Sequence, residues 1–207
     1  MDHRIRKLNR DFFQRDTLIV AKELLGKVLC RRLDHVILRG RIVETEGYLG
    51  LEDKAAHTFT GKITNRNRPL WGEAGHGYIY FTYGIHHLCN IVTEDEGIPN
   101  GVLLRALEPM DGISYMADHR FGRDLKDLTK DQKKNLTNGP AKLAEAMNIT
   151  SDMSGIDIIG NQIWVEDEGF TPEEIVETTR IGIDYSEEAI DYPYRFYIKG
   201  NPWVSKQ

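Results

Sequence analysis

Short runs of β-branched, aromatic and aliphatic residues, separated by glycine-rich or polar turns, constrain the fold of this chain more than any other feature of its sequence. The runs typical of strands cover residues 27–31, 35–39, 41–45, 77–83, 90–93, 101–107 and 195–205. Helical patterns do not alternate regularly with these runs, which argues against a doubly wound parallel sheet. The pattern predicts an α+β fold, in which a single domain of residues 1–207 contains a curved, mainly antiparallel β-sheet surrounded by helices.

Helices are predicted where capping signals precede an apolar stripe. Asp16 is a candidate N-cap for a helix that stops at Gly26. Residues 138–147, NGPAKLAEAM, place an asparagine and a proline where a cap and a first turn belong. Residues 171–174, TPEE, have the form of a capping box and predict a further helix. Gly40 separates two of the strand-like runs and predicts a bend or bulge there.

The composition is ordinary for a globular protein, with 40% hydrophobic and 29% charged residues among 207. No apolar run is long enough to span a membrane, and residues 1–13 lack the apolar stretch of a secretory signal. Cys30 and Cys89 fit neither a disulfide framework nor a thiolate zinc site. We expect a reduced, cytoplasmic protein that has no contact with a membrane and acts as a monomer.

The sequence lacks the common motifs of metal, nucleotide and nucleophile chemistry, namely HExxH, paired CxxC, the phosphate-binding loop, GxSxG and GxGxxG. His86 and His87 are adjacent and would point to opposite faces of a strand, so they make a poor chelate. Neither cysteine has a recognisable activating context. We therefore expect no metal, no cofactor and no thiol nucleophile.

The net charge is −5, but the charged residues are distributed unevenly along the chain. Residues 57–72 hold three bases and no acid, and residues 119–134 hold six bases against three aspartates. Residues 166–188 hold nine acids, with Arg180 as the one base. This pattern predicts a basic face suited to nucleic acid and an acidic face, although solvated loops of opposite sign would produce it equally well.

Glu44 and Glu46 are the first candidates for acid–base chemistry. They lie two residues apart in a strand-like run, so both side chains face the same side. A carboxylate beside a pocket can act as a general base on water, and a pair of carboxylates can serve a glycoside hydrolase. Judged by spacing alone, two solvated glutamates on an edge strand remain an alternative.

Aromatic residues are the second group of candidate site residues. Tyr48, His57 and Tyr80 carry rings that can stack on nucleobases, and π contacts are strongest with an electron-poor, cationic base. For Tyr78 we favour a role in the core. Tyr83 precedes a glycine, so it is a candidate to protrude from a turn as an intercalating wedge, with core packing as the alternative.

Polar residues near these rings suggest contacts with phosphate or with a base. Arg66, Asn67 and Arg68 carry donors suited to phosphate oxygens, or they belong to an exposed polar loop. Arg105 lies among apolar residues in VLLRALEP, where a buried guanidinium needs a carboxylate or carbonyl partner. Asn90, inside LCNIV, is either satisfied by the backbone or reads the edge of a base.

Taken in order, these segments resemble the 3-methyladenine (alkyladenine) DNA glycosylase family found in mammals and many bacteria. The matching segments are RIVETEGYLG, EDKAAH, NRNR, YIYFTYGIHHLCN, VLLRALEP, NGPAKLAEA, RIGI and RFYIKGNPWVS. They span nearly the whole chain in the order of the family, which is far more specific than any single motif. The resemblance implies a single domain around a curved antiparallel sheet, in agreement with the strand pattern.

The resemblance implies a catalytic group in which Glu46 matches the catalytic glutamate. Arg105 matches the arginine that positions the attacking water together with this glutamate. The main-chain carbonyl of Ile183 would be a third partner of the water.

The resemblance also implies a base pocket and a DNA surface. The residues that match the pocket are Tyr48, His57, Tyr80, Asn90 and Ile183. Asn90 matches an asparagine that excludes guanine by crowding its exocyclic amine. Tyr83 matches the tyrosine that enters the minor groove and fills the vacated stack. The residues expected to contact DNA are Arg66, Asn67, Arg68 and Leu70.

The implied function is that of a monofunctional DNA glycosylase of base excision repair. Its partner would be double-stranded DNA that contains alkylated or deaminated purines, which it would flip out of the duplex. Water activated by Glu46 would then hydrolyse the N-glycosidic bond and leave an abasic site. Two alternatives remain, namely a damaged-DNA binding module without catalysis and a glycoside hydrolase that uses Glu44 and Glu46.

Overall fold

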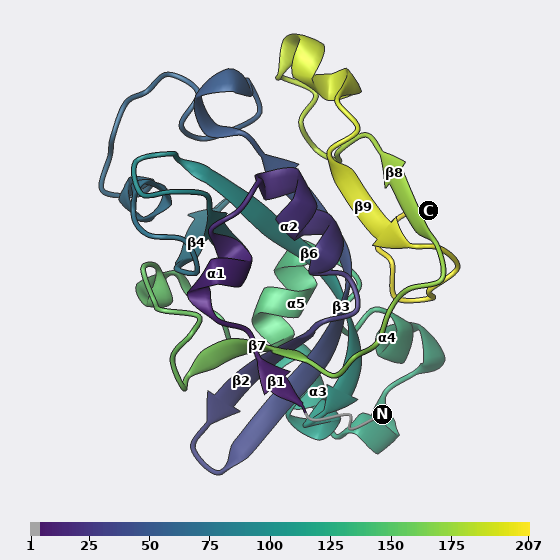
Figure 1. Ribbon diagram of the computed structural model, residues 1–207. Coiled ribbons are helices and arrows are strands. Elements are labelled where there is room, and N and C mark those ends of the chain that lie inside the picture. Colours follow the sequence, from purple (N-terminus) through teal and green to yellow (C-terminus); the bar gives the residue numbers. More distant parts are fainter. Residues whose placement is uncertain (1–4) are drawn as a thin grey trace.

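The computed structural model describes residues 5–207, and a nine-stranded sheet is the main element of this part of the chain (Figure 1). The strands are β1 (Arg6–Lys7), β2 (Val28–Leu33), β3 (Val36–Tyr48), β4 (Gly77–Thr82), β5 (His86–Thr93), β6 (Asn100–Asp111), β7 (Ile163–Asp167), β8 (Ile175–Thr178) and β9 (Arg195–Ile198). The α-helices are α1 (Arg10–Phe13), α2 (Thr17–Glu23), α3 (Ile113–Phe121), α4 (Lys130–Lys134) and α5 (Pro140–Ala146). Short 3₁₀ turns include η1 (Gly50–Glu52), η2 (Arg68–Trp71) and η5 (Glu187–Asp191). The first four residues, part of the start predicted to lack a secretory signal, lie outside the described residues.

The long strand β3 organises the sheet. The strand order is β1-β7-β2-β3-β6-β5-β4, and neighbouring strands are antiparallel. β6 runs along one edge of β3, while the other edge pairs first with β2 and then, at Glu44–Glu46, with β9. Figure 1 shows β8 and β9 side by side at the right, and β9 joins them to β3 near the end of that strand. The predicted α+β fold with a curved, mainly antiparallel sheet is confirmed.

Bulges between β3 and β6 shape the segment that carries the two glutamates. The register shifts next to Gly40 and on both sides of Glu44. The runs predicted at residues 35–39 and 41–45 are therefore one continuous strand with a bulge at the glycine. Arg105 is the extra residue of another bulge, because its two neighbours pair with Glu44 and Thr45. A bulge re-aims the side chains beside it, and this one lies where charged groups converge.

Two of the predicted helices are confirmed. The helix α2 begins after Asp16, whose side chain accepts a hydrogen bond from the Ile19 amide at 2.9 Å. The helix α5 begins with Pro140 in its first turn, as predicted, but its N-cap residue is Gly139 and not the preceding asparagine. Both helices pack on the sheet, α2 against β3 and β6 and α5 against β5 and β6.

The helix predicted from TPEE at residues 171–174 is wrong. The segment leads directly into β8, in which Val176 pairs with Tyr197 of β9. The β-branched residues after TPEE favour a strand, and pairing with β9 outweighs a local capping signal.

A hydrogen bond from β3 to α2 sets the direction of the glutamate side chains. The Thr45 hydroxyl donates to the Ala21 carbonyl at 2.8 Å and so faces the helix layer, which Figure 1 shows in purple across the near side of the sheet. Since side chains alternate along a strand, Glu44 and Glu46 face the opposite side, as predicted.

The acidic stretch at residues 166–188 does not form the free acidic face that its composition predicted. Seven of its nine acids are ion-paired with bases from elsewhere in the chain. The pairs are Glu166 and Glu168 with Arg39, Asp167 with Lys27, Glu174 with Lys199, Glu177 with Lys22, and Glu187 and Glu188 with Lys54. The one base of the stretch, Arg180, is buried.

Across residues 5–207, no helix is long and apolar enough to cross a membrane. Within the same residues, no group of three or more His, Cys, Asp or Glu side chains is arranged to hold a metal ion. Cys30 and Cys89 are free and buried, and burial raises the pKa of each thiol to about 12. Neither cysteine is therefore a thiolate at neutral pH.

Candidate active site

A cavity of about 510 Å³ opens beside the end of β3, between the β4–β5 hairpin and the loops that hold His57 and Ile183. Its wall is largely aromatic and aliphatic, with a few polar groups. All five residues predicted for a base pocket line it: Tyr48, His57, Tyr80, Asn90 and Ile183. A mostly apolar cavity with a few convergent polar groups is the usual form of a ligand site.

A larger hollow of about 660 Å³ lies between the N-terminal segment, α2 and the loop before β8. Its lining mixes five basic and three acidic side chains, among which Arg15 pairs with Glu23 and Lys27 with Asp167. None of the predicted site residues lines this hollow. We therefore take the aromatic cavity as the candidate active site.

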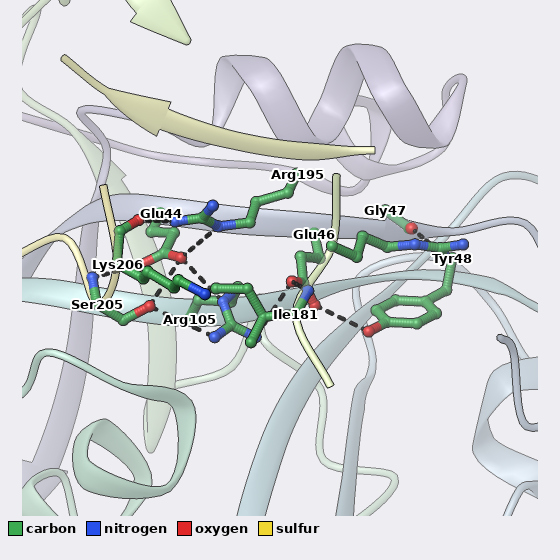
Figure 2. A network of polar contacts seen from close by, with 10 residues as sticks. Glu44, Glu46, Gly47, Tyr48, Arg105, Ile181, Arg195, Ser205 and Lys206 are labelled. Atoms are coloured by element: carbon green, nitrogen blue, oxygen red, sulfur yellow. Dashed lines mark hydrogen bonds and ion pairs between the residues drawn. The ribbon is translucent and has the colours of Figure 1, made fainter. Parts of the chain in front are cut away.

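The carboxylate of Glu46 is fully buried. It contacts three residues that line the cavity, namely Tyr48, Arg105 and Ile181 (Figure 2). Its Oε1 accepts a hydrogen bond from the Ile181 amide at 2.8 Å and lies 3.2 Å from Arg105 Nη1. Its Oε2 accepts a hydrogen bond from the Tyr48 hydroxyl at 2.8 Å. Burial, followed by the charge of Glu46, raises the pKa of Tyr48 well above its ordinary value, so the phenol stays protonated. A carboxylate oxygen has two acceptor positions, so Oε2 keeps one for a water molecule.

Glu44 has a different environment, although it faces the same side of the same strand. Its Oε1 accepts hydrogen bonds from Arg105 Nε at 2.9 Å, Arg195 Nε at 2.7 Å and Ser205 Oγ at 2.9 Å. Its Oε2 accepts one from the Ser205 amide at 2.7 Å. Burial alone would raise the pKa of Glu44, but Arg105, the Ser205 amide and Arg195 hold it below its ordinary value. Glu44 is thus a fixed anion, and its contact with Arg105 orients that guanidinium.

Arg180 and Asp53 support Tyr48 from behind. The Arg180 guanidinium lies 4.6 Å from the centre of the Tyr48 ring. It forms a bidentate pair with Asp53, with Nη2 at 2.8 Å from Oδ1, and also donates to the Gly47 carbonyl at 2.9 Å. Both charged groups are almost completely buried. The stacked guanidinium leaves the Tyr48 ring little freedom to tilt.

His57, Tyr78 and Tyr80 form the opposite aromatic wall. His57 Nδ1 lies 2.9 Å from the Tyr78 hydroxyl, and its ring meets Tyr80 edge-on at 4.6 Å between centres. Burial and then the charge of Arg66 lower the pKa of His57 to about 4, so the imidazole is neutral at pH 7. Tyr78 is buried, as predicted for a core residue, and it also lines the cavity.

Asn90 and Ile183 take positions that refine their predicted roles. The Asn90 amide nitrogen donates to the Tyr78 carbonyl at 3.1 Å, so the backbone satisfies this group while the side chain lines the cavity. The Ile183 carbonyl already accepts two hydrogen bonds from Ser186, at 2.9 Å from its amide and 2.6 Å from its hydroxyl. Both acceptor positions of this carbonyl are thus occupied in the structure, and its contact with a water stays a prediction.

Tyr83 protrudes from the tip of the β4–β5 hairpin and is 89% exposed. The turn is closed by a hydrogen bond from the Ile85 amide to the Thr82 carbonyl at 3.2 Å. Tyr83 and Gly84 both have positive φ, at 51° and 71°, as in the type I′ turn that normally holds asparagine and glycine. For tyrosine this conformation costs about 1–2 kcal/mol. Local strain of this kind is concentrated at functional sites.

The NRNR segment divides into exposed and structural residues. Arg66 and Arg68 are exposed, and the Arg66 guanidinium lies 5.0 Å from the centre of the Tyr80 ring at the cavity rim. Asn67 is buried, and its amide bonds to backbone groups of its own loop, including the Thr64 amide at 2.8 Å. Leu70 is buried against Tyr78. Neither the Asn67 nor the Leu70 side chain reaches the surface in this structure, and their contacts with DNA stay a prediction.

Several residues of the site were not predicted as functional. They are Asp53, Arg180, Ile181, Arg195 and Ser205. All five lie within segments that carry the family resemblance, namely EDKAAH, RIGI and RFYIKGNPWVS. Nothing in their local pattern distinguishes them, because their partners are more than 100 residues away in the sequence.

An aromatic cavity, an ion-paired glutamate behind its wall and a strained, protruding tyrosine beside it form a site suited to a flat ring. DNA glycosylases are a class of enzyme that binds such rings. Residues 11–202 match the family described as Methylpurine-DNA glycosylase (MPG), and the chain belongs to this family. It is therefore a DNA glycosylase, a hydrolase of DNA repair that binds damaged DNA.

Curated relatives match along nearly their whole length. A protein of Clostridium acetobutylicum is 51% identical over 199 residues, which cover 96% of this chain and 97% of the relative. A protein of Alkaliphilus oremlandii is 50% identical over 201 residues, covering 97% of this chain and 100% of the relative. Both carry the name 3-methyladenine DNA glycosylase, given provisionally.

Proposed function

We propose that this chain is a monofunctional glycosylase that excises alkylated or deaminated purines from double-stranded DNA. The observation that carries the proposal is the buried Glu46 carboxylate, held between Arg105 and Tyr48 at the wall of an aromatic cavity. The names of the relatives from Clostridium acetobutylicum and Alkaliphilus oremlandii, which refer to 3-methyladenine, agree with this substrate class.

In the proposed binding step, the damaged purine leaves the duplex and enters the cavity, while Tyr83 fills the vacated stack. Lesions that pair poorly cost less to flip, which favours damaged over normal bases. The rings of Tyr48 and Tyr80 would stack on the base, and alkylated purines with a positive charge gain most from this contact. Asn90 would crowd the exocyclic amine of guanine.

In the proposed chemical step, Glu46 takes a proton from water, and the water oxygen bonds to the anomeric carbon of the deoxyribose. The bond from that carbon to the base nitrogen breaks, and its electron pair leaves with the base. Arg105 keeps the carboxylate in place, and the negative charge stabilises the oxocarbenium-like centre. The products are the free base and an abasic site.

One chain supplies all the residues used in this scheme, so we propose a monomer that needs neither metal nor cofactor. Among the described residues that line the cavity there is no lysine. A Schiff base with the sugar, and the strand cleavage that follows from it, are therefore not part of the proposal.

The test compares variants of the two glutamates on duplexes that contain 3-methyladenine, 7-methylguanine, hypoxanthine or ethenoadenine, with alkali used to cleave abasic sites. Glu46→Gln is expected to slow base release at least about 100-fold, the usual contribution of a general base, while its affinity for the duplex stays near wild type. Glu52→Gln, on the exposed turn η1, is the matched control and should behave as wild type. Inactivity of the wild type on all four lesions would refute the proposal.

The two alternatives make different predictions in the same experiment. A binding module without catalysis predicts no base release by the wild type. A glycoside hydrolase would need Glu44 as a second acid, base or nucleophile, and would lose turnover of sugars equally in Glu44→Gln and Glu46→Gln. The four hydrogen bonds to Glu44 argue against this, because they hold it as an anion with no proton to give, and of its partners only Arg105 lines the cavity.

A further inference from the structure

The C-terminal segment of the chain returns to the charged cluster behind the candidate active site (Figure 2). After β9, the chain turns back so that Ser205 reaches Glu44 on the central strand β3. The Ser205 amide and hydroxyl donate to the two Glu44 oxygens at 2.7 Å and 2.9 Å. The same hydroxyl oxygen accepts a hydrogen bond from Arg105 Nη2 at 3.4 Å. Ser205 therefore contacts both the anion that orients Arg105 and the guanidinium itself.

These contacts place a restraint on every nitrogen of the Arg105 guanidinium. Nε donates to Glu44 at 2.9 Å, Nη2 donates to Ser205, and Nη1 lies 3.2 Å from Glu46 Oε1. A guanidinium is planar, with its donors in a rigid fork. Fixing Nε and Nη2 therefore fixes the direction in which Nη1 points, which is toward Glu46.

The segment around Ser205 is itself held on both sides. Before it, Val204 is buried in the main core. After it, the Lys206 carbonyl accepts a hydrogen bond from Arg195 Nη2, and Arg195 also binds Glu44. The tail is thus anchored independently of the serine hydroxyl. Loss of the hydroxyl alone should leave the backbone of the tail in place.

We infer that Ser205 is a positioning residue for base excision, which acts through Arg105 and Glu44 to hold the Glu46 carboxylate in the geometry that activates water. This inference rests on the proposed glycosylase function. Ser205 is thereby linked to the catalytic group, although it does not line the cavity.

The test uses Ser205→Ala, Ser205→Thr and Ser114→Ala, the last being an exposed serine of α3 that serves as a matched control. Single-turnover rates of base release are measured with enzyme in excess over a duplex that contains hypoxanthine. Affinity is measured separately with a duplex that contains a stable abasic-site analogue. Ser205→Ala is expected to slow base release about 10-fold, as for a lost hydrogen bond to a charged group. Its affinity and melting temperature should stay close to wild type, and Ser205→Thr, which keeps the hydroxyl, should recover most of the rate.

Three results would overturn the inference. One is an unchanged rate in Ser205→Ala while Glu46→Gln remains inactive, which would leave the proposed function intact. Another is a loss of affinity as large as the loss of rate, and a third is a rate in Ser205→Thr no better than in Ser205→Ala. If the wild type released no base, the proposed function would fail together with the inference.

Discussion

The buried ion pair of Asp53 and Arg180 lies next to Tyr48 in the cavity wall, and its contribution to the stability of the protein can be predicted. Asp53 is 1% exposed, and besides Arg180 its carboxylate accepts hydrogen bonds from the Leu49 and Ala55 amides at 3.2 Å and 3.0 Å. Asp53→Asn keeps the shape of the side chain but leaves the guanidinium buried without a counterion. Removing one partner of a buried ion pair costs about 3–5 kcal/mol, so we expect a loss of this size in the free energy of unfolding.

The assay is equilibrium denaturation in urea, with the free energy of unfolding extrapolated linearly to water. The pair is isolated by a double-mutant cycle with Arg180→Met, which removes the other charge and keeps an apolar chain next to Tyr48. We expect the double variant to lose clearly less than the sum of the two single variants, because it leaves no charge buried alone.

The neighbouring residue Lys54 provides the control. Its partners Glu187 and Glu188 are more than half exposed, so solvent screens these pairs and Lys54→Met should leave the denaturation midpoint near wild type. A loss of less than about 1 kcal/mol in Asp53→Asn, or strict additivity in the cycle, would refute the reasoning that this pair is a buried support for the cavity wall.

Two further predictions concern the cavity rim. Because burial and Arg66 lower the pKa of His57 to about 4, folding favours its neutral form, while the unfolded chain binds a proton below about pH 6.5. The stability that His57 contributes is complete above that pH and is lost toward pH 4, so the urea midpoints of wild type and His57→Gln should converge as the pH falls. A constant difference would contradict this. Arg66, over the Tyr80 ring, should disfavour a cationic base there. Arg66→Met should raise the ratio of base-release rates for 7-methylguanine over hypoxanthine about twofold, since like charges about 8 Å apart, on the two sides of the Tyr80 ring, cost about 0.5 kcal/mol in water. Arg66→Lys, which keeps the charge, should not change the ratio.

The sheet was largely predictable because its signals are local. Strand-like runs and turn glycines mark β2 to β6 in the sequence, and the observed strands start or end within a few residues of the predicted limits. The strands β1 and β7 were not predicted, and the strand expected at residues 195–205 ends at Ile198. At residues 171–174 a local capping signal competes with pairing between β8 and β9, and the pairing wins because the partner strand satisfies a whole row of backbone groups.

The site was predictable only where the family resemblance identified it. The pocket residues Tyr48, His57, Tyr80 and Asn90 converge as expected. The support behind them was not predicted, because an arginine such as Arg180 looks the same in sequence whether it is solvated or paired with a buried acid. Asn67 is the opposite case. Its sequence context suited a contact with phosphate, but its side chain forms hydrogen bonds with the backbone of its own loop.

Glu44 and Glu46 show how structure separates two groups that sequence treats alike. They share a strand, a face and a partner, Arg105, and both are completely buried. At Glu44 the tail, β9 and Arg105 supply four donors, which hold the carboxylate as a fixed anion. At Glu46 the second oxygen has one donor, Tyr48, which also lines the cavity, so this carboxylate is joined directly to the cavity wall. The difference arises where β3 exchanges its neighbour β2 for β9, and a bulge there gives Arg105 access to both carboxylates.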